Sequence, residues 1–150
     1  MTETLLVHAT AMAIAGSAVL LRGPSGSGKS DLALRLIDAG ASLVADDQSQ
    51  LSRDGATILV SAPGPIAGLI EVRGVGIVRV GALSVARLAL IADLVAPERV
   101  ERLPEPCSET ILGLAIPLVA VAPFEASAPV KLRLALGEAA GDETTGAPQR

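Results

Sequence analysis

The chain has 150 residues and a formal net charge of −4, and half of its residues are hydrophobic although Phe124 is the only aromatic one. This length suits one domain with an aliphatic core, and the acidic balance without a basic patch argues against a nucleic-acid-binding protein. With the single cysteine Cys107 no intramolecular disulfide can form, which fits a reducing cytoplasm.

The first 22 residues are apolar, but they lack a basic leading region and are interrupted by His8 and Gly16. Because Arg22 ends this stretch before the roughly 20 apolar residues that a membrane span needs, we expect neither a signal peptide nor a membrane segment. The pattern predicts strands at 4–13 and 18–22 around a turn at Gly16-Ser17.

After these strands, the apolar spacing predicts a helix at 30–39, with Gly40 as the residue that ends it, and a strand at 42–47. The later predicted elements are a hairpin at 50–61 with Asp54-Gly55 at its turn, a loop or short turn at 62–68, an extended segment at 69–80 broken by Gly74 and Gly76, a buried strand at 87–95, a proline-rich loop at 96–109 and one or two strands at 110–122. Residues 130–136 fit either a strand or the start of a helix. The fold expected is a strand-rich α/β domain at 1–136, followed by a disordered tail at 137–150.

The segment GPSGSGKS matches the phosphate-binding P-loop motif in full, between a predicted strand and a predicted helix. Glycines let backbone N–H groups approach phosphate oxygens, and the helix N-terminus adds partial positive charge. Lys29 is expected to reach the β- and γ-phosphates, and Ser30 to coordinate Mg²⁺. The predicted nucleotide-binding residues are Gly23, Pro24, Ser25, Gly26, Ser27, Gly28, Lys29 and Ser30.

Two aspartates, Asp46 and Asp47, end the strand that follows the P-loop helix, 17 and 18 residues after Lys29. A strand–loop–helix–strand unit would place the two parallel strands near each other, so that their ends bring the P-loop and the acids together. Neighbouring strand residues point to opposite faces. We therefore expect one aspartate to face the metal and phosphates, and the other to act as general base on an incoming hydroxyl.

Taken together, these segments resemble the catalytic domain of the HPr kinase/phosphorylase family. The resemblance is carried by His8, GPSGSGKSDLAL, LVADD, EVRGVGIV and ETILGLAIP, over about residues 5–122. It implies a nucleotide-binding fold like that of phosphoenolpyruvate carboxykinase. It also implies ATP- and Mg²⁺-dependent phosphorylation of a serine on HPr, the phosphocarrier of the sugar phosphotransferase system, and hexamers are typical of the family.

The resemblance also assigns roles to individual residues. Asp47 matches the acceptor of the serine proton, Asp46 its neighbour near the metal, and His8 the histidine placed against the acid pair. Glu71 matches a metal ligand, and Arg102 matches an arginine that contacts phosphate.

The sequence departs from the family pattern in four places, one of which is the C-terminal helix pair, which we expect to be truncated. The matching segments begin almost at Met1, so we expect a short form with the catalytic domain alone, and Ala9 follows His8 where the family has glycine. The segment APFEASAP has no basic residue, although the family's loop there usually carries basic residues and is linked to phosphorolysis. We therefore expect the kinase reaction and leave reversal by phosphorolysis open.

Two other functions stay open on the residues alone. A small-metabolite kinase would usually carry an arginine-rich lid, and no such run occurs. A nucleotide-binding regulator would keep Lys29 and Ser30 but transfer no phosphate. The sequence does not identify the HPr paralogue, the preferred phosphoryl donor, the oligomeric state, the regulator or the pathway.

Overall fold

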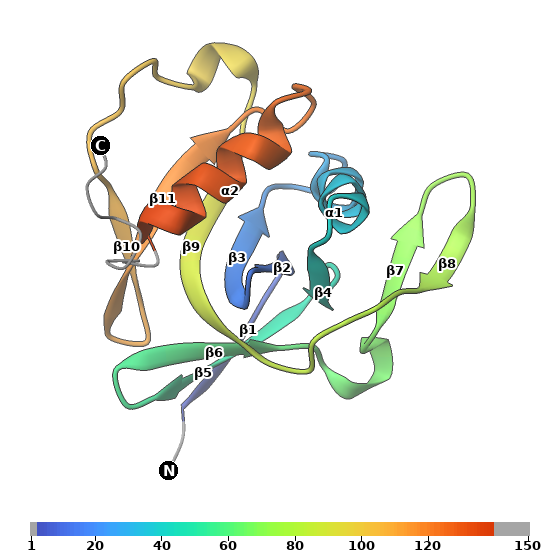
Figure 1. Cartoon of the computed structure of the whole chain (residues 1–150). Helices are drawn as coiled ribbons and strands as arrows, with labels where there is room; N and C mark the ends of the chain where they lie inside the picture. Colours follow the sequence, from blue (N-terminus) through green and yellow to red (C-terminus); the bar gives the residue numbers. More distant parts are fainter. Residues whose placement is uncertain (1–2, 140–150) are drawn as a thin grey trace.

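The computed structural model describes residues 3–139, which form a strand-rich α/β fold (Figure 1). The strands are β1 (Thr4–Val7), β2 (Thr10–Ile14), β3 (Ser17–Arg22), β4 (Ser42–Ala45), β5 (Ser49–Asp54), β6 (Thr57–Ser61), β7 (Leu69–Val72), β8 (Gly76–Arg79), β9 (Ala86–Leu94), β10 (Ser108–Ile111) and β11 (Leu114–Val121). The helices are α1 (Lys29–Asp38) and α2 (Ala128–Ala139), with single 3-10 turns at Gly64–Ile66 and Pro97–Arg99.

The main sheet of the described residues branches at β9. Its continuous path runs β1-β5-β6-β9-β3-β2-β4. One edge of β9 pairs in parallel with β3, while the other edge pairs with β6 near Ala86 and Arg87 and in parallel with β11 from Ile91 to Leu94. The strands β3, β9 and β11 are therefore parallel neighbours, and the segments that follow them leave the sheet at the same end.

Alternation along the buried strands produces two hydrophobic clusters, one on each face of the sheet. Val19 and Leu21 of β3 face α1 and α2, and they pack in a cluster with Leu32, Leu36 and Leu132. The intervening residues of β3, Ala18 and Leu20, belong to a second cluster that includes Leu51, Ile58 and Ile116 of the β5–β6 and β10–β11 hairpins. These two packed faces fix the end of β3 and hence the loop that follows it.

Helix α1 matches the predicted helix at 30–39 within a residue at either end. Leu32, Ala33 and Leu36 form its buried face, as the apolar spacing predicts. Gly40 follows the helix with φ of 105°, a left-handed conformation that glycine adopts without a steric cost. The apolar spacing thus accounts for the buried face of this helix, and Gly40 accounts for its end.

The two parallel strands on either side of the P-loop helix, β3 and β4, lie near each other but do not pair. Strand β2 lies between them and pairs antiparallel with both. The cause is the turn at Ala15 and Gly16, which folds β2 back onto β3 and thereby occupies the edge of β3 that β4 would take. The predicted strand at 4–13 is also two strands, because the chain leaves the sheet at His8 and Ala9.

Other predicted elements are confirmed, some with changed limits. The hairpin at 50–61, the buried strand at 87–95 and the loop at 96–109 are present, and residues 110–122 hold two strands. Residues 130–136 are helical, which decides between the two alternatives. Helix α2 continues to Ala139, so residues 137–139 are not part of a disordered tail, and residues 140–150 lie outside the described part of the chain.

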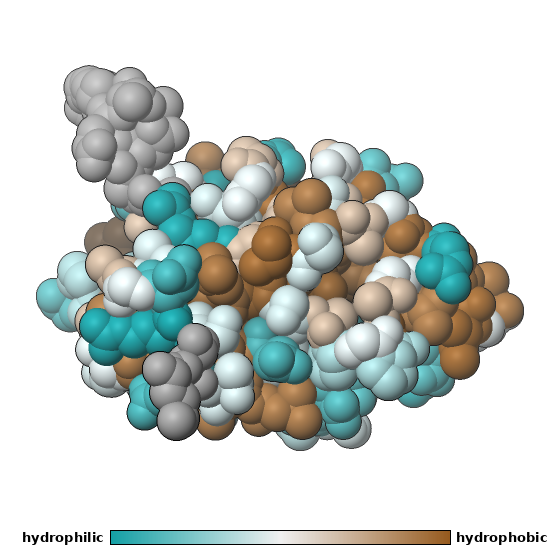
Figure 2. Space-filling view, turned by 90° about the horizontal axis from the view of Figure 1, so that it is seen from below, coloured by the Kyte–Doolittle hydropathy of each residue, from teal (hydrophilic) through white to brown (hydrophobic). Residues whose placement is uncertain are grey.

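The break at Gly74 and Gly76 in segment 69–80 is the turn of a separate hairpin, β7–β8. This hairpin projects from the body of the molecule beside α1 (Figure 1). Figure 2 is turned about the horizontal axis, so this hairpin lies on the right in both views, where the surface in Figure 2 is largely hydrophobic. Val75 and Ile77 of this hairpin are each 73% exposed. Within residues 3–139 no helix is long and apolar enough to cross a membrane.

Candidate active site

The glycine-rich loop, residues 23–28, connects the end of β3 to the first residue of α1. Gly26 and Gly28 have φ of 83° and 105°, in the left-handed region that favours glycine. At Gly23 a side chain is excluded for a different reason, because an added Cβ would lie 2.4 Å from Ser27 Oγ. The three glycines of the motif are thus each required by the conformation of the loop.

The loop presents unpaired backbone donors at the N-terminus of α1. Within residues 3–139, the N–H groups of Gly26, Gly28, Lys29 and Ser30 donate to no backbone or side-chain acceptor. Such groups together form a concave site suited to an anion. Ser27 Oγ is buried and likewise has no partner among the described residues.

Lys29 is buried under this loop. Its Nζ donates to the carbonyl oxygens of Gly23 and Pro24 at 2.6 and 3.1 Å. A buried ammonium group is stable only when it is hydrogen-bonded, so these carbonyl groups hold the charge at the inner side of the loop. The positive charge of Lys29 and the free N–H groups therefore act on the same small region.

Asp46 is the buried member of the acid pair and connects four segments. Its Oδ1 accepts hydrogen bonds from Ser30 Oγ at 3.0 Å and from Thr10 Oγ1 at 3.2 Å. Its Oδ2 accepts the backbone N–H of Glu71 at 3.2 Å. Although β2 separates β3 from β4, the structure thus brings the end of β4 into contact with the first turn of α1.

Asp47 points away from Asp46 and is exposed. Its Oδ1 lies 2.7 Å from Nε2 of His8, which is also exposed. The φ of Asp47 is 69°, and its N–H donates to the hydroxyl of Thr10 at 3.0 Å. Thr10 thus bonds both aspartates, of which one is buried and the other exposed. The predicted strand at 42–47 ends at Ala45, so this difference comes from the left-handed backbone at Asp47 and the contacts of Thr10, and not from alternation along a strand.

The remaining predicted residues are only partly assembled. Glu71 meets Asp46 through its backbone, while its exposed carboxylate has no hydrogen bond or ion pair within residues 3–139. Arg102 is exposed in the loop before β10 and makes no polar contact in the same part of the chain. No group of three or more His, Cys, Asp or Glu is placed to hold a metal ion in the described range.

An ion-pair network behind the glycine-rich loop was not predicted from the sequence. Arg22, the residue before the loop, forms two hydrogen bonds with Asp93 of β9 and two with Glu109 of β10, at 2.7 to 3.2 Å. Hydrogen bonds with Glu109 and then Asp93 raise the pKa of Arg22 above its ordinary value. The same contact lowers the pKa of Glu109.

Comparison with known proteins identifies the family. The family model described as "HPr Serine kinase C-terminal domain" matches residues 1–122. The chain belongs to this family.

The chain also resembles individual members of the HPr kinase family. It is 40% identical over 128 residues to an HPr kinase/phosphorylase of Bordetella pertussis, covering 77% of this chain and 42% of that protein. It is 42% identical over 128 residues to an HPr kinase/phosphorylase of Leptothrix cholodnii, covering 77% of this chain and 39% of that protein. The chain thus spans about two fifths of the length of these curated relatives.

The solved structure of the HPr(Ser) kinase/phosphatase from Coxiella burnetii matches this fold. The TM-score is 0.81 at 26% sequence identity, and the match covers 95% of this chain and 96% of that chain. The strand-rich α/β architecture is therefore that of an HPr kinase structure.

The family implies a nucleotide substrate, and the residues of the glycine-rich loop fit a nucleotide phosphate. Phosphate oxygens accept hydrogen bonds, and this loop supplies donors for them. These donors are the four free N–H groups, the Ser27 hydroxyl, which is buried without a partner among the described residues, and the adjacent Lys29. Ser30 and Asp46, 3.0 Å apart, are oxygen ligands of the kind that Mg²⁺ prefers. The site thus has suitable groups for both, and Glu71 would have to turn its carboxylate inward to join them.

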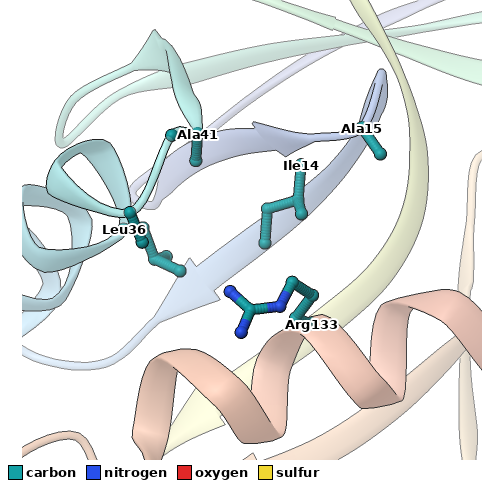
Figure 3. A pocket seen from close by; sticks show the side chains of 7 residues that line it. Ile14, Ala15, Leu36, Ala41 and Arg133 are labelled. Carbon is teal, nitrogen blue, oxygen red and sulfur yellow. The ribbon is translucent and has the colours of Figure 1, made fainter.

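A cavity of about 190 Å³ lies elsewhere, at the other end of α1. Figure 3 shows Arg133 of α2 directed toward Ile14 and Leu36 across it. Since α1 has 10 residues, this cavity is about 15 Å from the glycine-rich loop. It is separate from the candidate active site.

Proposed function

We propose that this chain is an ATP-dependent serine kinase that phosphorylates an HPr-type phosphocarrier protein and requires Mg²⁺. The observation that carries the proposal is the contact of Ser30 with Asp46, with Asp47 directed to the other side. It supports a nucleotide site of the phosphoenolpyruvate carboxykinase type at 23–30, with a general base beside it. The names of the matched relatives support HPr as the protein substrate.

The described residues divide the work of phosphoryl transfer. Lys29 and the free N–H groups of the loop would bind the phosphates and stabilise charge as it develops. Ser30, Asp46 and, after rotation, Glu71 would hold the Mg²⁺, which supplies neutralisation of phosphate charge when bound. Arg102 would reach phosphate only if its loop moves toward the site.

Asp47 would accept the proton of the serine hydroxyl, and His8 would hold the carboxylate in position. Both side chains are more than half exposed, so a serine presented by another protein can reach them. A general base contributes roughly 10²- to 10⁴-fold to the rate. In the reverse direction the same carboxyl group would return the proton, which is how phosphorolysis by inorganic phosphate would use this site.

The proposal extends to the setting of the enzyme. We propose a cytoplasmic protein that assembles into homo-oligomers, as the hexamers of the family suggest, and that binds neither nucleic acid nor membrane. The net charge of −4 supports a partner with a basic docking surface.

The decisive experiment incubates an HPr-type protein with this chain, ATP and Mg²⁺ and locates phosphate by mass spectrometry. The expected product is a single phosphoserine, with at least about 100-fold less product from the Asp47→Asn variant. Asp38→Asn, at an exposed aspartate on the last turn of α1, is the matched control and should retain activity. Added inorganic phosphate then tests reversal.

Each alternative has its own result. If ATP binds and no phosphoserine forms on any HPr-type protein, the kinase proposal is wrong, and a nucleotide-binding regulator fits better. If phosphate appears on a small hydroxylated metabolite instead, the chain is a metabolite kinase.

A further inference from the structure

The aromatic ring of Phe124 lies directly on the glycine-rich loop. A Cβ built at Gly28 would be 2.9 Å from Phe124 Cζ and 3.2 Å from Cε1, so no side chain separates the ring from the loop backbone. Phe124 is nevertheless 68% exposed. It therefore offers the rest of its surface to solvent, next to N–H groups of the glycine-rich loop that have no partner among the described residues.

The segment that carries the ring, residues 122–127 between β11 and α2, is tied to α1. The guanidinium of Arg35 donates to the carbonyl oxygens of Pro123 and Glu125, and it also pairs with Asp31 at 3.0 Å. Lys131 of α2 pairs with the Glu125 carboxylate at 2.8 Å. Pro123 itself is buried, so the exposed ring stands on a fixed segment.

The topology explains why these two segments meet. The glycine-rich loop follows β3 and residues 122–127 follow β11, and both strands run parallel to β9, which lies between them. Ligands of open α/β sheets bind outside the carboxyl ends of parallel strands. The loop and residues 122–127 therefore leave the sheet at the same end, where a nucleotide with its phosphates on the loop would also place its sugar and base.

We propose that Phe124 is the stacking platform for the nucleobase of the phosphoryl donor. This inference rests on the proposed function, because it takes the loop as the phosphate site. Stacking on an aromatic ring is tolerant of base identity, since every base has a π-face. Phe124 therefore adds affinity for nucleoside triphosphates in general, and ATP and GTP depend on it alike.

The test separates base from phosphate by using inorganic tripolyphosphate as a ligand that has no base. Calorimetry with Mg²⁺ compares ATP, GTP and tripolyphosphate on the wild-type chain and on Phe124→Ala. We expect Phe124→Ala to weaken the binding of ATP and GTP by about 5- to 150-fold and to leave the affinity for tripolyphosphate unchanged. Leu134→Ala, which removes a side chain of nearly equal exposure (67%) on α2, should change none of them.

Three results overturn the proposal. If Phe124→Ala weakens the binding of ATP and of tripolyphosphate equally, the ring only supports the loop. Unchanged affinity for all three ligands means that no base contacts it, even if phosphorylation of the protein substrate falls. A wild-type chain that binds no nucleotide overturns both proposals, whereas one that binds ATP without forming phosphoserine overturns the kinase proposal alone.

A second measurement uses fluorescence to detect the contact between the base and residue 124. The chain has no Trp and no Tyr, so Phe124→Trp places the sole indole of the protein at the proposed platform. ATP should change its fluorescence at saturation, and tripolyphosphate should not. The same change with both ligands contradicts stacking on the base.

Discussion

His8 Nε2 and Asp47 Oδ1 lie 2.7 Å apart, although 39 positions separate the two residues in the chain. The contact joins the break between β1 and β2 to the end of β4. Both side chains remain accessible at 51% and 62% exposure. An exposed carboxylate held by a histidine is suited to meet a hydroxyl group delivered by a second molecule.

Replacing His8 with alanine should therefore slow phosphoryl transfer without weakening the binding of ATP. Loss of the contact leaves Asp47 free to rotate, and misplacement of a catalytic group by about 1 Å can cost roughly 100-fold. We expect a fall in kcat of at least about tenfold, smaller than that of Asp47→Asn. Steady-state kinetics and calorimetry check it, and an unchanged kcat would remove His8 from the mechanism.

Thr10→Val should disturb both aspartates at once. The buried hydroxyl donates to Asp46 and accepts the N–H of Asp47, so its removal leaves buried polar groups unpaired. We expect the free energy of unfolding in urea to fall by about 1–3 kcal/mol, together with a loss of kinase activity. Thr10→Ser keeps the hydroxyl and should retain most of both properties. If Thr10→Ser were as harmful as Thr10→Val, the hydroxyl that serine retains would not be the group that matters, and this prediction would be wrong.

Gly28→Ala should be more harmful than Gly26→Ala. Both glycines have positive φ, so both substitutions carry the strain of a left-handed alanine, about 1–2 kcal/mol. At Gly28 the new Cβ also meets the Phe124 ring at 2.9 Å, whereas nothing lies within 4 Å at Gly26. Thermal melts of the two variants measure the difference. Adding Phe124→Ala to Gly28→Ala should recover part of the loss, and no recovery would exclude the steric clash.

Glu109→Gln should lower stability at neutral pH, and this effect should vanish in acid. The contact with Arg22 holds the pKa of folded Glu109 below its ordinary value of 4.5. The carboxylate therefore stabilises the fold above that value, and its contribution is lost as the pH falls through the lower folded pKa. Because the Glu109 side chain is 37% exposed, we expect only about 1 kcal/mol. Urea unfolding of both proteins between pH 7 and pH 3 checks this, and a pH-independent difference would contradict it.

Local features of the fold could be predicted from the sequence because they depend on local chemistry. Helix α1 follows from its apolar spacing, the motif at its start and Gly40 at its end. The β5–β6 hairpin follows from Asp54-Gly55. The pairing of β2 with β3 follows from the turn at Ala15 and Gly16, but no residue pattern in β4 indicates that β4 pairs with β2. For α2, the alternation of VKLRLAL suits a strand, and contacts with β9 and β11 decide for a helix.

In the candidate site, too, residues with a local sequence signal could be predicted, and residues that depend on distant partners could not. The glycine-rich loop, the two aspartates and His8 could be singled out from motif, spacing and resemblance, and the structure places them together. Thr10 could not, because one threonine in an apolar strand carries no signal of its own. Arg22 offered a weak signal, a charged residue at the end of a buried strand, but its partners Asp93 and Glu109 lie 71 and 87 positions away.

The N–H group of Glu71 donates to the side chain of Asp46, 25 positions upstream. Its hydrogen exchange with solvent therefore depends on that carboxylate as well as on the β7–β8 hairpin. A cation bound at Asp46 Oδ2 would compete with this amide for the carboxylate. The backbone of the projecting hairpin is thus coupled, through one hydrogen bond, to the buried carboxylate of the candidate site.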